Sequence, residues 1–373
     1  MKIAVAMSGG VDSSVAAKIL KNEGHDLVGL FLKLWSDSSS SCSTRKENRC
    51  CDYEALEDAR IVAAKLKISF YVIDAKVEFK KEVVDYFLQE YKNLRTPNPC
   101  IVCNETIKFD LLLKKVLSIG CEKLATGHYA RIEDGKLFKG VDETKDQSYM
   151  LYRLKQNQLS KVMFPIGEMK KKNVRDLATL WDLPVKEKPE SQEICFFADK
   201  DHRAFLRRYL DAGYFKSGDI VDSEGNIIGQ HDGLLNYTIG QRRLIDQLRA
   251  SSFKLQADKQ PLYVIGFDKE KNQLIVGNDE EVYKKEMIVS NLNWIDKKLD
   301  LKSKKLKVKI RYHHPEVECE TIEQLSNPSR PGKAEANEAI RVVFVEKQRA
   351  ITPGQSAVFY LGDEVLSGGI IES

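Results

Sequence analysis

The chain has 373 residues, of which 42% are hydrophobic and 31% are charged, so its composition excludes an intrinsically disordered, collagen-like or low-complexity protein. The length predicts two to three domains, and 59 basic against 55 acidic residues give a net charge of +4, too small to indicate a nucleic-acid partner by itself. No apolar run reaches the roughly 18 residues of a membrane span and no secretory signal is found, so we expect a soluble, cytoplasmic protein.

The first half of the chain alternates predicted strands and helices. Strands are predicted at 2–7, 26–34, 69–74 and 121–126, and helices at 11–21, 54–67, 80–94 and 109–119. Strands that alternate with helices of this length are typical of a doubly wound parallel sheet with right-handed crossovers. Ligands of such α/β sheets bind at the carboxyl ends of the strands.

The pattern changes after about residue 200. A short basic helix is predicted at 199–211, a glycine-rich stretch follows, and short β-segments are predicted at 263–267, 273–276, 306–312, 339–344 and 356–360. Short strands at such spacing are typical of a small barrel or sandwich. We therefore expect an α/β nucleotide-binding domain at 1–200, a small central module at 201–280 and a C-terminal β-barrel-like domain at 281–373.

The sharpest local motif is Ser8-Gly9-Gly10-Val11-Asp12-Ser13-Ser14, which follows the first strand and opens the first helix. Glycines allow close approach of an anion, and a helix N-terminus offers unpaired N–H groups and the positive end of the helix dipole. Asp12 would either hold Mg²⁺ or orient the loop. The motif predicts a phosphate-binding loop without the lysine of a Walker A sequence. A Gly-Ser turn with polar caps is the weaker interpretation in this strand–loop–helix context.

Two further segments carry cysteines that could do chemistry. Cys100 and Cys103 follow Thr96-Pro97-Asn98-Pro99 and precede the predicted helix around Phe109. A thiol at a helix N-terminus has a lowered pKa, so we expect nucleophilic thiols here. Cys195 lies between polar and aromatic residues in the segment 190–197. Cys121 and Cys319 are interpreted as core residues, and a metal or redox role for Cys42, Cys50 and Cys51 stays open.

Taken together, these motifs closely resemble those of the bacterial tRNA-uridine 2-sulfurtransferase (tRNA 2-thiouridylase) family, nearly from end to end. The resemblance includes SGGVDSS, TPNPCIVCNETIKF, ATGHYARI, KDQSYML, FPIGEMKK, ESQEICFF, HDGLLNYTIGQR, RYHHP and RAITPGQSAVFY. The phosphate loop also resembles that of the ATP-pyrophosphatase superfamily, which has an adenine nucleotide alpha hydrolase-like fold. The resemblance implies that the wobble uridine of tRNA is adenylated on O2 by ATP, with Mg²⁺, that sulfur then attacks C2, and that the central module binds tRNA.

The resemblance also implies a role for individual residues. Cys103 matches the nucleophile, and Cys195 matches the cysteine that receives a persulfide from a cysteine desulfurase or its relay protein; the two would form a disulfide after transfer. ATP contacts are implied at Ala6, Met7, Ser8, Gly9, Gly10, Val11, Asp12, Ser13, Leu32 and Gly127. Contacts with the extruded target base are implied at Asn98, Pro99 and Cys100. Other tRNA contacts are implied at His128, Lys145, Asp146, Gln147, Arg311, Tyr312 and Gln355.

The segment that contains Arg311 fits a nucleic-acid contact from the residues upward. Lys305, Lys307, Lys309 and Arg311 alternate with apolar residues, which predicts a strand with its basic groups on one face. An ordinary solvated strand face would give the same charge pattern and is the simpler interpretation of that pattern alone.

The chain departs from the family pattern at several positions. Most members carry Asp where this chain has Cys100, and Met where it has Leu32. Three thiols, Cys100, Cys103 and Cys195, could hold a [4Fe–4S] cluster with one open iron that binds hydrosulfide. The persulfide and the cluster are therefore both open as the sulfur source. The loop that follows Arg243 also lacks the usual Gly-Leu-Gly run.

Two other functions compete with tRNA thiolation. An ATP-dependent ligase or amidotransferase acting on a small acid would need neither Cys103 nor Cys195, and its pyrophosphate release would not depend on tRNA. A tRNA-binding protein without activity would not need the intact loop from Ser8 to Ser14. The identity of the tRNAs, the sulfur relay partner and the oligomeric state do not follow from the sequence.

Overall fold

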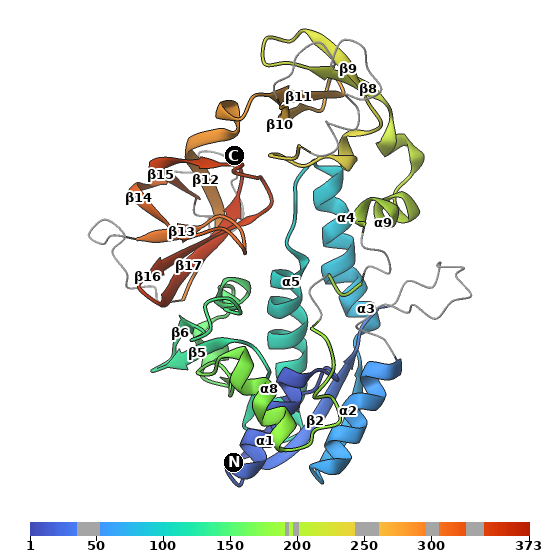
Figure 1. Cartoon of the computed structure of the whole chain (residues 1–373), viewed down its shortest axis with the longest axis vertical. Coiled ribbons are helices and arrows are strands. Elements are labelled where there is room, and N and C mark those ends of the chain that lie inside the picture. The colour runs from blue at the N-terminus through green and yellow to red at the C-terminus, as the bar shows by residue number, and fades with distance from the viewer. Residues whose placement is uncertain (36–52, 191–193, 197–200, 243–260, 296–305, 326–338) are drawn as a thin grey trace.

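The computed structural model describes residues 1–35, 53–190, 194–196, 201–242, 261–295, 306–325 and 339–373. An α/β domain lies at the bottom of Figure 1, a β-barrel lies above it to the left, and a small β-module lies at the top. The predicted combination of an N-terminal parallel sheet, a small central module and a C-terminal β-barrel is confirmed. The expectations for Cys42, Cys50, Cys51 and Lys305 and for the loop that follows Arg243 lie outside the described residues.

The N-terminal sheet has the strand order β3-β2-β1-β4-β7 and all of its pairings are parallel. Its strands are β1 (Lys2–Ala6), β2 (Asp26–Lys33), β3 (Ser69–Asp74), β4 (Lys123–Ala125) and β7 (Val162–Met163). Alternate residues of β1 enter two different cores. Ile3 and Val5 pack with the helices α1 (Val11–Asn22), α2 (Tyr53–Lys65) and α8 (Lys171–Leu180), whereas Ala4 packs with Phe109. Each face of the sheet is thus covered, as a doubly wound sheet requires.

Two long helices run upward from this sheet in Figure 1, and each contains a π-helical segment. The first is formed by α3 (Lys76–Phe79), a π-segment (Lys80–Val84) and α4 (Asp85–Lys92). The second is formed by α5 (Pro99–Val102), a π-segment (Cys103–Leu112) and α6 (Leu113–Ser118). This second helix begins earlier than predicted, because Pro99 occupies its first turn, where proline loses no hydrogen bond. Both cysteines of the motif therefore lie inside the helix rather than before it.

Six antiparallel strands form the C-terminal barrel, in the order β12-β15-β14-β13-β16-β17, and a pairing of β12 with β17 closes it. The strands are β12 (Tyr283–Trp294), β13 (Lys307–Lys309), β14 (Val317–Leu325), β15 (Ala339–Arg349), β16 (Ser356–Leu361) and β17 (Glu364–Ile371). Sequence analysis did not predict β12, β14 and β17. None of the three shows a regular alternation of buried and exposed residues: β12 is exposed or half-buried at most positions, β14 has no fully buried residue, and β17 is buried almost throughout.

The central module is a four-stranded sheet in the order β10-β11-β8-β9, preceded by the predicted basic helix, here α9 (His202–Tyr209). Its strands are β8 (Gly218–Val221), β9 (Ile227–His231), β10 (Tyr263–Asp268) and β11 (Gln273–Gly277). Among the described residues, no helix is long and apolar enough to cross a membrane.

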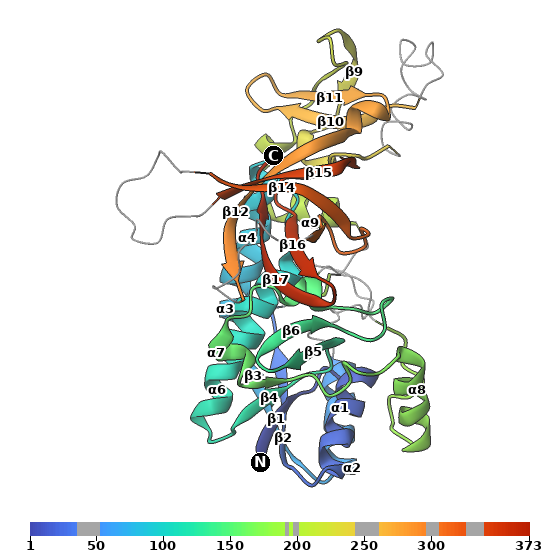
Figure 2. The same ribbon diagram turned by 90° about the vertical axis from the view of Figure 1, so that its left-hand side faces the viewer.

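A hairpin from the N-terminal part joins the α/β domain to the barrel. The hairpin is formed by β5 (Ala130–Glu133) and β6 (Lys136–Lys139), and β6 pairs with β17, as Figure 2 shows below the barrel. The core that contains Phe109 also contains Val358 and Tyr360 of the barrel. Shared packing therefore fixes the barrel against the helix that carries Cys100 and Cys103.

Candidate active site

The predicted phosphate loop lies where β1 ends and α1 begins. Gly10 is the N-cap of α1 and makes no side-chain capping hydrogen bond, so the first N–H groups of the helix are not bonded to a capping side chain. The serine hydroxyls brace the loop from within: Ser13 Oγ accepts from Ser8 N at 3.1 Å, and Ser14 Oγ donates to Gly10 O at 2.8 Å. This geometry is that of an anion-binding helix N-terminus.

Gly9 is required by the protein itself rather than by an anion. Its φ is +70°, and a Cβ on Gly9 would lie 2.1 Å from the carbonyl oxygen of Ala55 at the start of α2. A Cβ on Gly10 would meet only Ser8 Oγ at 3.4 Å. The expectation that glycine leaves room for a ligand therefore fits Gly10, while Gly9 permits the left-handed turn and the close packing of α2.

Gly127 brings the end of β4 against the phosphate loop. A Cβ on this glycine would lie 2.7 Å from the backbone nitrogen of Ser13, which leaves no room for any side chain. The next residue, His128, shares a 2.6 Å hydrogen bond with Thr126 Oγ1 and lies against the rings of Phe109 and Phe164. Burial and the nearby charge of Lys108 hold the pKa of His128 well below its usual range, so the imidazole is neutral at pH 7.

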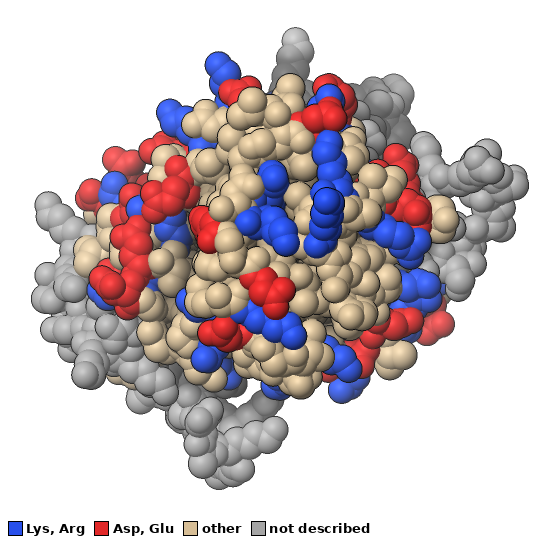
Figure 3. Space-filling view, turned by 90° about the horizontal axis from the view of Figure 1, so that it is seen from below, with Lys and Arg blue, Asp and Glu red and all other residues tan. Residues whose placement is uncertain are grey.

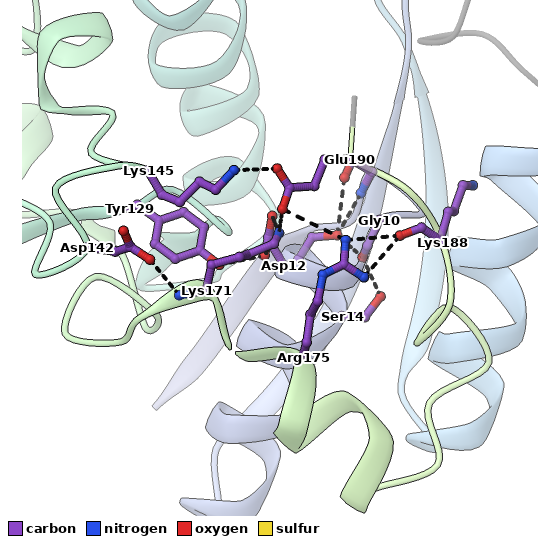
Figure 4. Close-up of polar contacts among 12 residues, drawn as sticks. Gly10, Asp12, Ser14, Tyr129, Asp142, Lys145, Lys171, Arg175, Lys188 and Glu190 are labelled. Atoms are coloured by element: carbon purple, nitrogen blue, oxygen red, sulfur yellow. Dashed lines mark hydrogen bonds and ion pairs between the residues drawn. The ribbon is translucent and has the colours of Figure 1, made fainter. Parts of the chain in front are cut away.

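A charged network surrounds Asp12 beside the loop (Figure 4). Lys171 Nζ, at the start of α8, donates to both oxygens of Asp12 at 2.7 Å, and Tyr129 Oη donates to Asp12 Oδ1 at 2.8 Å. Protein donors thus engage both carboxylate oxygens of Asp12 and hold it beside the loop, and its Mg²⁺-binding role stays a prediction. Lys171 also lies 3.5 Å from Glu190, which Lys145 Nζ approaches at 2.6 Å.

Sequence reasoning missed several members of this network. Lys171 lies in the quoted FPIGEMKK segment and Glu190 opens the quoted ESQEICFF segment, but neither residue was assigned a role. Burial opposes ionisation of Glu190, yet Lys145 and Lys171 outweigh it and lower the pKa of that carboxyl. Arg175 adds a third cation 3.8 Å from Glu190. Only the fold brings these separate segments of the chain to the phosphate loop.

The three cysteines of interest converge in one place. Cys103 is buried in the core that also contains Phe196, and Cys195 packs against that core. The charges of Cys100 and Cys195 both act on Cys103, and that of Cys195 acts on Cys100. The helix that starts at Pro99 and the segment after Glu190 therefore bring the three thiols near one another, and this group is called the thiol cluster.

The expectation of a lowered thiol pKa is wrong for the resting protein. Burial raises the pKa of Cys100 to about 11 and that of Cys103 to about 12. The sequence argument placed both thiols at a solvated helix end, whereas the helix begins earlier and its first turns pack into the interior. Lys108 contributes in the opposite direction at both cysteines.

The predicted disulfide and the predicted iron–sulfur cluster can both be compared with this geometry. No disulfide joins Cys103 to Cys195 in the described structure, so this disulfide stays a prediction for a later state of the reaction. Over the described ranges, no group of three or more His, Cys, Asp or Glu side chains is arranged to hold a metal ion. The three thiols do not form such a group in this arrangement, and the iron–sulfur cluster stays a prediction.

The barrel holds the cysteine-bearing segment from the other side. Thr96 N donates to Pro353 O at 2.8 Å, and Gln355 Nε2 donates to Thr96 O at 2.9 Å. Arg95 donates to both Glu90 and Glu372. Gln355, predicted to contact tRNA, therefore also fixes the approach to the helix that carries Cys100.

Asn98, Pro99 and Cys100 have structural roles of their own. Asn98 Oδ1 accepts from Cys100 N at 3.2 Å and so caps the helix, while Pro99 is buried in its first turn. Asn98 and Cys100 are half-buried, and Tyr312 of the barrel lies close enough to Cys100 for their charges to interact. The target-base contacts of these residues stay predictions.

Other residues with implied tRNA contacts make hydrogen bonds within the protein itself. Asp146 is buried and accepts hydrogen bonds from Gly140 N and from Ser148 N and Oγ, and Gln147 Oε1 accepts from Tyr129 N. Arg311 is half-buried, with a 3.4 Å hydrogen bond to Arg349 O. Asp146 thus has a structural role that sequence reasoning did not assign. The implied tRNA contacts stay predictions.

The alternation predicted around Arg311 is confirmed over the described residues, although the strand β13 is shorter than expected. Leu306, Val308 and Ile310 are buried, whereas Lys307 is exposed and Lys309 is half-buried.

On the lower face of the N-terminal domain, basic and acidic side chains are interspersed (Figure 3). Charge on this face therefore does not point to a nucleic-acid surface.

The predicted nucleotide contacts at Ala6, Met7 and Leu32 lie on neighbouring strands. Met7 is buried and its backbone nitrogen donates to Leu30 O at 2.8 Å, which places the end of β2 beside the phosphate loop. Leu32 is half-buried and packs against two cores. Their contacts with ATP stay predictions.

Three family models match the chain in succession. They are described as a tRNA methyl transferase HUP domain at residues 1–199, a tRNA methyl transferase PRC-barrel domain at 203–278 and an aminomethyltransferase beta-barrel domain at 284–371. Curated relatives that match over nearly their whole length are named 2-thiouridylases rather than methyl transferases.

The tRNA-specific 2-thiouridylase MnmA of Geobacter metallireducens is 44% identical to this chain, and the match covers 100% of this chain and 97% of the relative. The protein of that name from Clostridioides difficile is 42% identical, covering 100% and 98%. Among solved structures, NMN synthetase from Francisella tularensis has a TM-score of 0.31 at 16% identity, over 51% of this chain and 66% of that chain.

Proposed function

Because the chain belongs to the family of tRNA-specific 2-thiouridylases, we propose that it catalyses the ATP-dependent 2-thiolation of the wobble uridine of tRNA in the cytoplasm. One observation supports this proposal above the others. Gly127 packs against Ser13 of the phosphate loop, and the charge of Lys108 acts both on the adjoining His128 and on Cys103. This arrangement supports a nucleotide site and a sulfur site in the same region of the protein.

In the first step, uridine O2 attacks the α-phosphate of ATP and pyrophosphate leaves. The O2–P bond forms, the bond to the β-phosphate breaks, and the N3 proton passes to solvent. The N–H groups at the start of α1 would bind phosphate oxygens. Lys145, Lys171 and Arg175 would balance the charge of the pyrophosphate, with Mg²⁺ entering as the counter-ion of ATP.

In the second step, the terminal sulfur of a persulfide on Cys195 attacks C2, and AMP leaves with the electron pair of the C2–O bond. The thiolate of Cys103 then attacks Sγ of Cys195. The Sγ–S bond breaks, its electron pair stays on the sulfur bound to C2, and a Cys103–Cys195 disulfide forms. A thiol reductant restores the two thiols, and a cysteine desulfurase or its relay protein supplies the next sulfur atom.

The test uses the full chain purified without oxygen, with a uridine-34 tRNA transcript, ATP and a desulfurase with free cysteine. Retardation of the product on a mercury-containing gel detects 2-thiouridine. Cys103→Ala and Cys195→Ala should each abolish thiolation, whereas Cys121→Ala, at a buried cysteine of a different core, should keep it. Pyrophosphate release that ignores both tRNA and Cys103 would instead favour a ligase acting on a small acid.

Iron analysis of the same preparation separates the two sulfur sources. We expect no stoichiometric iron together with full thiolation. About four irons per chain that disappear in Cys100→Ala would show that a cluster, rather than a Cys195 persulfide, carries the sulfur.

A further inference from the structure

Three basic side chains converge on the carboxylate of Glu190 beside the phosphate loop (Figure 4). Lys145 Nζ donates to Glu190 Oε2 at 2.6 Å. The ammonium of Lys171 and the guanidinium of Arg175 lie 3.5 Å and 3.8 Å from Glu190 Oε1. The three cations are buried or half-buried, so little water screens their charge. Several cations around one carboxylate are an arrangement that also suits a phosphate group.

The same cations adjoin the anion-binding N-terminus of α1. Lys171 Nζ donates to both oxygens of Asp12 at 2.7 Å, and Asp12 lies in the first turn of that helix. The ammonium of Lys171 therefore lies between the carboxylates of Asp12 and Glu190. A triphosphate bound at the helix N-terminus would need these cations and would compete with the two carboxylates for them.

Of the two carboxylates, that of Asp12 is the more firmly held. Asp12 belongs to α1 and accepts a 2.8 Å hydrogen bond from Tyr129 Oη in addition to the bonds from Lys171. Glu190 lies outside any helix or strand, and two of its three cation contacts are 3.5 Å or longer. Glu190 is therefore the carboxylate that can yield its place to a phosphate.

The chain is anchored just before Glu190. Lys188 pairs with Asp58 of α2, and the carbonyl oxygen of Lys188 accepts from Arg175 Nη1 at 3.4 Å. These contacts fix the backbone two residues before Glu190. A movement of the Glu190 side chain away from the cations would thus leave both the phosphate loop and the preceding segment in place.

We propose that Glu190 is the resident anion of the pyrophosphate subsite. When no nucleotide is bound, its carboxylate balances the surrounding cations, and the β- and γ-phosphates of ATP displace it. After adenylation the carboxylate returns, lowers the affinity for the pyrophosphate product and so promotes its release. No covalent bond of Glu190 forms or breaks. The inference depends on the proposed function for the identity of the reaction.

The experiment measures the binding of inorganic pyrophosphate and of a non-hydrolysable ATP analogue to the full chain by calorimetric titration. Glu190→Gln removes the carboxylate charge, and Glu190→Ala is a second neutral variant. Glu187→Gln is the matched control, because Glu187 belongs to the same segment but is exposed. Lys145→Met, alone and combined with Glu190→Gln, tests whether the effect depends on the cations.

We expect both neutral variants of Glu190 to bind pyrophosphate about tenfold more tightly than the parent, because the ligand no longer displaces a charge-assisted hydrogen bond. Glu187→Gln should match the parent. The gain from Glu190→Gln should shrink in the Lys145→Met background, where one cation of the subsite is missing. Pyrophosphate should also raise the melting temperature of Glu190→Gln more than that of the parent, and the same scans check folding.

Other outcomes overturn the inference. Unchanged pyrophosphate affinity in both neutral variants would show that Glu190 does not compete for the subsite, and a weaker affinity would show that it helps to bind the ligand. An equal gain in Glu187→Gln would reduce the effect to net charge. Absence of pyrophosphate binding to the parent and to both neutral variants would leave no subsite. If the parent forms no 2-thiouridine, the proposed function fails, whereas pyrophosphate binding remains measurable without tRNA or sulfur.

Discussion

Lys171 Nζ donates to both carboxylate oxygens of Asp12, each at 2.7 Å, although the two residues are 159 positions apart in the chain. Only 11% of the lysine side chain is exposed, so its charge depends on this partner. The contact joins the phosphate loop to the start of α8, and Lys171 also lies 3.5 Å from Glu190. Asp12, Lys171 and Glu190 thus belong to one charged network beside the phosphate loop.

Asp12→Asn should lower the free energy of unfolding by about 1–3 kcal/mol, because it leaves the Lys171 ammonium without its counter-charge. Lys171→Met combined with Asp12→Asn should cost less than the sum of the single changes. Urea denaturation of the four proteins in this cycle gives the coupling. Asp110→Asn, at an exposed pair with Lys114, is the control, and equal effects at the two sites would contradict the prediction.

Gly127→Ala should weaken ATP binding by at least about tenfold, because the new Cβ would lie 2.7 Å from the backbone nitrogen of Ser13 and displace the phosphate loop. Calorimetric titration with a non-hydrolysable ATP analogue measures the affinity. Gly213→Ala is the matched control, since its Cβ would meet no atom within 4 Å. An unchanged affinity in Gly127→Ala would show that the loop tolerates the shift.

The Glu372 carboxyl should make stability depend on pH at the acidic end. Burial opposes its ionisation, but bonds from Arg95 and Ser290 outweigh it and lower the pKa below the unfolded value. The folded state therefore binds its proton less readily, and this contribution to stability is present above about pH 4.5. It is lost as the pH falls through the folded pKa.

Denaturation between pH 7 and pH 3 measures this effect. Glu372→Gln should be less stable than the parent at pH 7 and should approach it at pH 3. Glu318→Gln on β14 is the control, because Glu318 makes no ion pair within the described structure. A constant difference between parent and Glu372→Gln across the range would rule out the linkage.

Cys100→Ser should keep thiolation within about threefold of the parent. Burial raises the pKa of Cys100 to about 11, so the residue is a neutral thiol at pH 7 and a hydroxyl of similar size replaces it. Single-turnover thiolation measures the effect, with Cys103→Ser as the inactive comparison. A loss as large as that of Cys103→Ser would mean that Cys100 is itself a reacting thiol or a ligand.

The sequence alone predicted the phosphate loop and the parallel sheet, and its motifs, including the three cysteines, indicated the family. The loop and the strands can be predicted because the strand–glycine–helix order and the β-branched periodicity depend on residues that are neighbours in the sequence. The sequence did not predict the start of the helix at Pro99, because two prolines are also typical of an extended segment. It also did not predict β12, β14 and β17, which lack a regular alternation of buried and exposed residues.

Tertiary structure alone decided the electrostatics of the site. The same thiol that helix position predicts to be acidic becomes a weak acid once its turn is buried, so the pKa of Cys103 depends on packing rather than on sequence neighbours. The pairing of Asp12 with Lys171 likewise joins chain segments that meet only in the fold. Coulombic interactions and desolvation depend on distance in space, which a linear motif does not record.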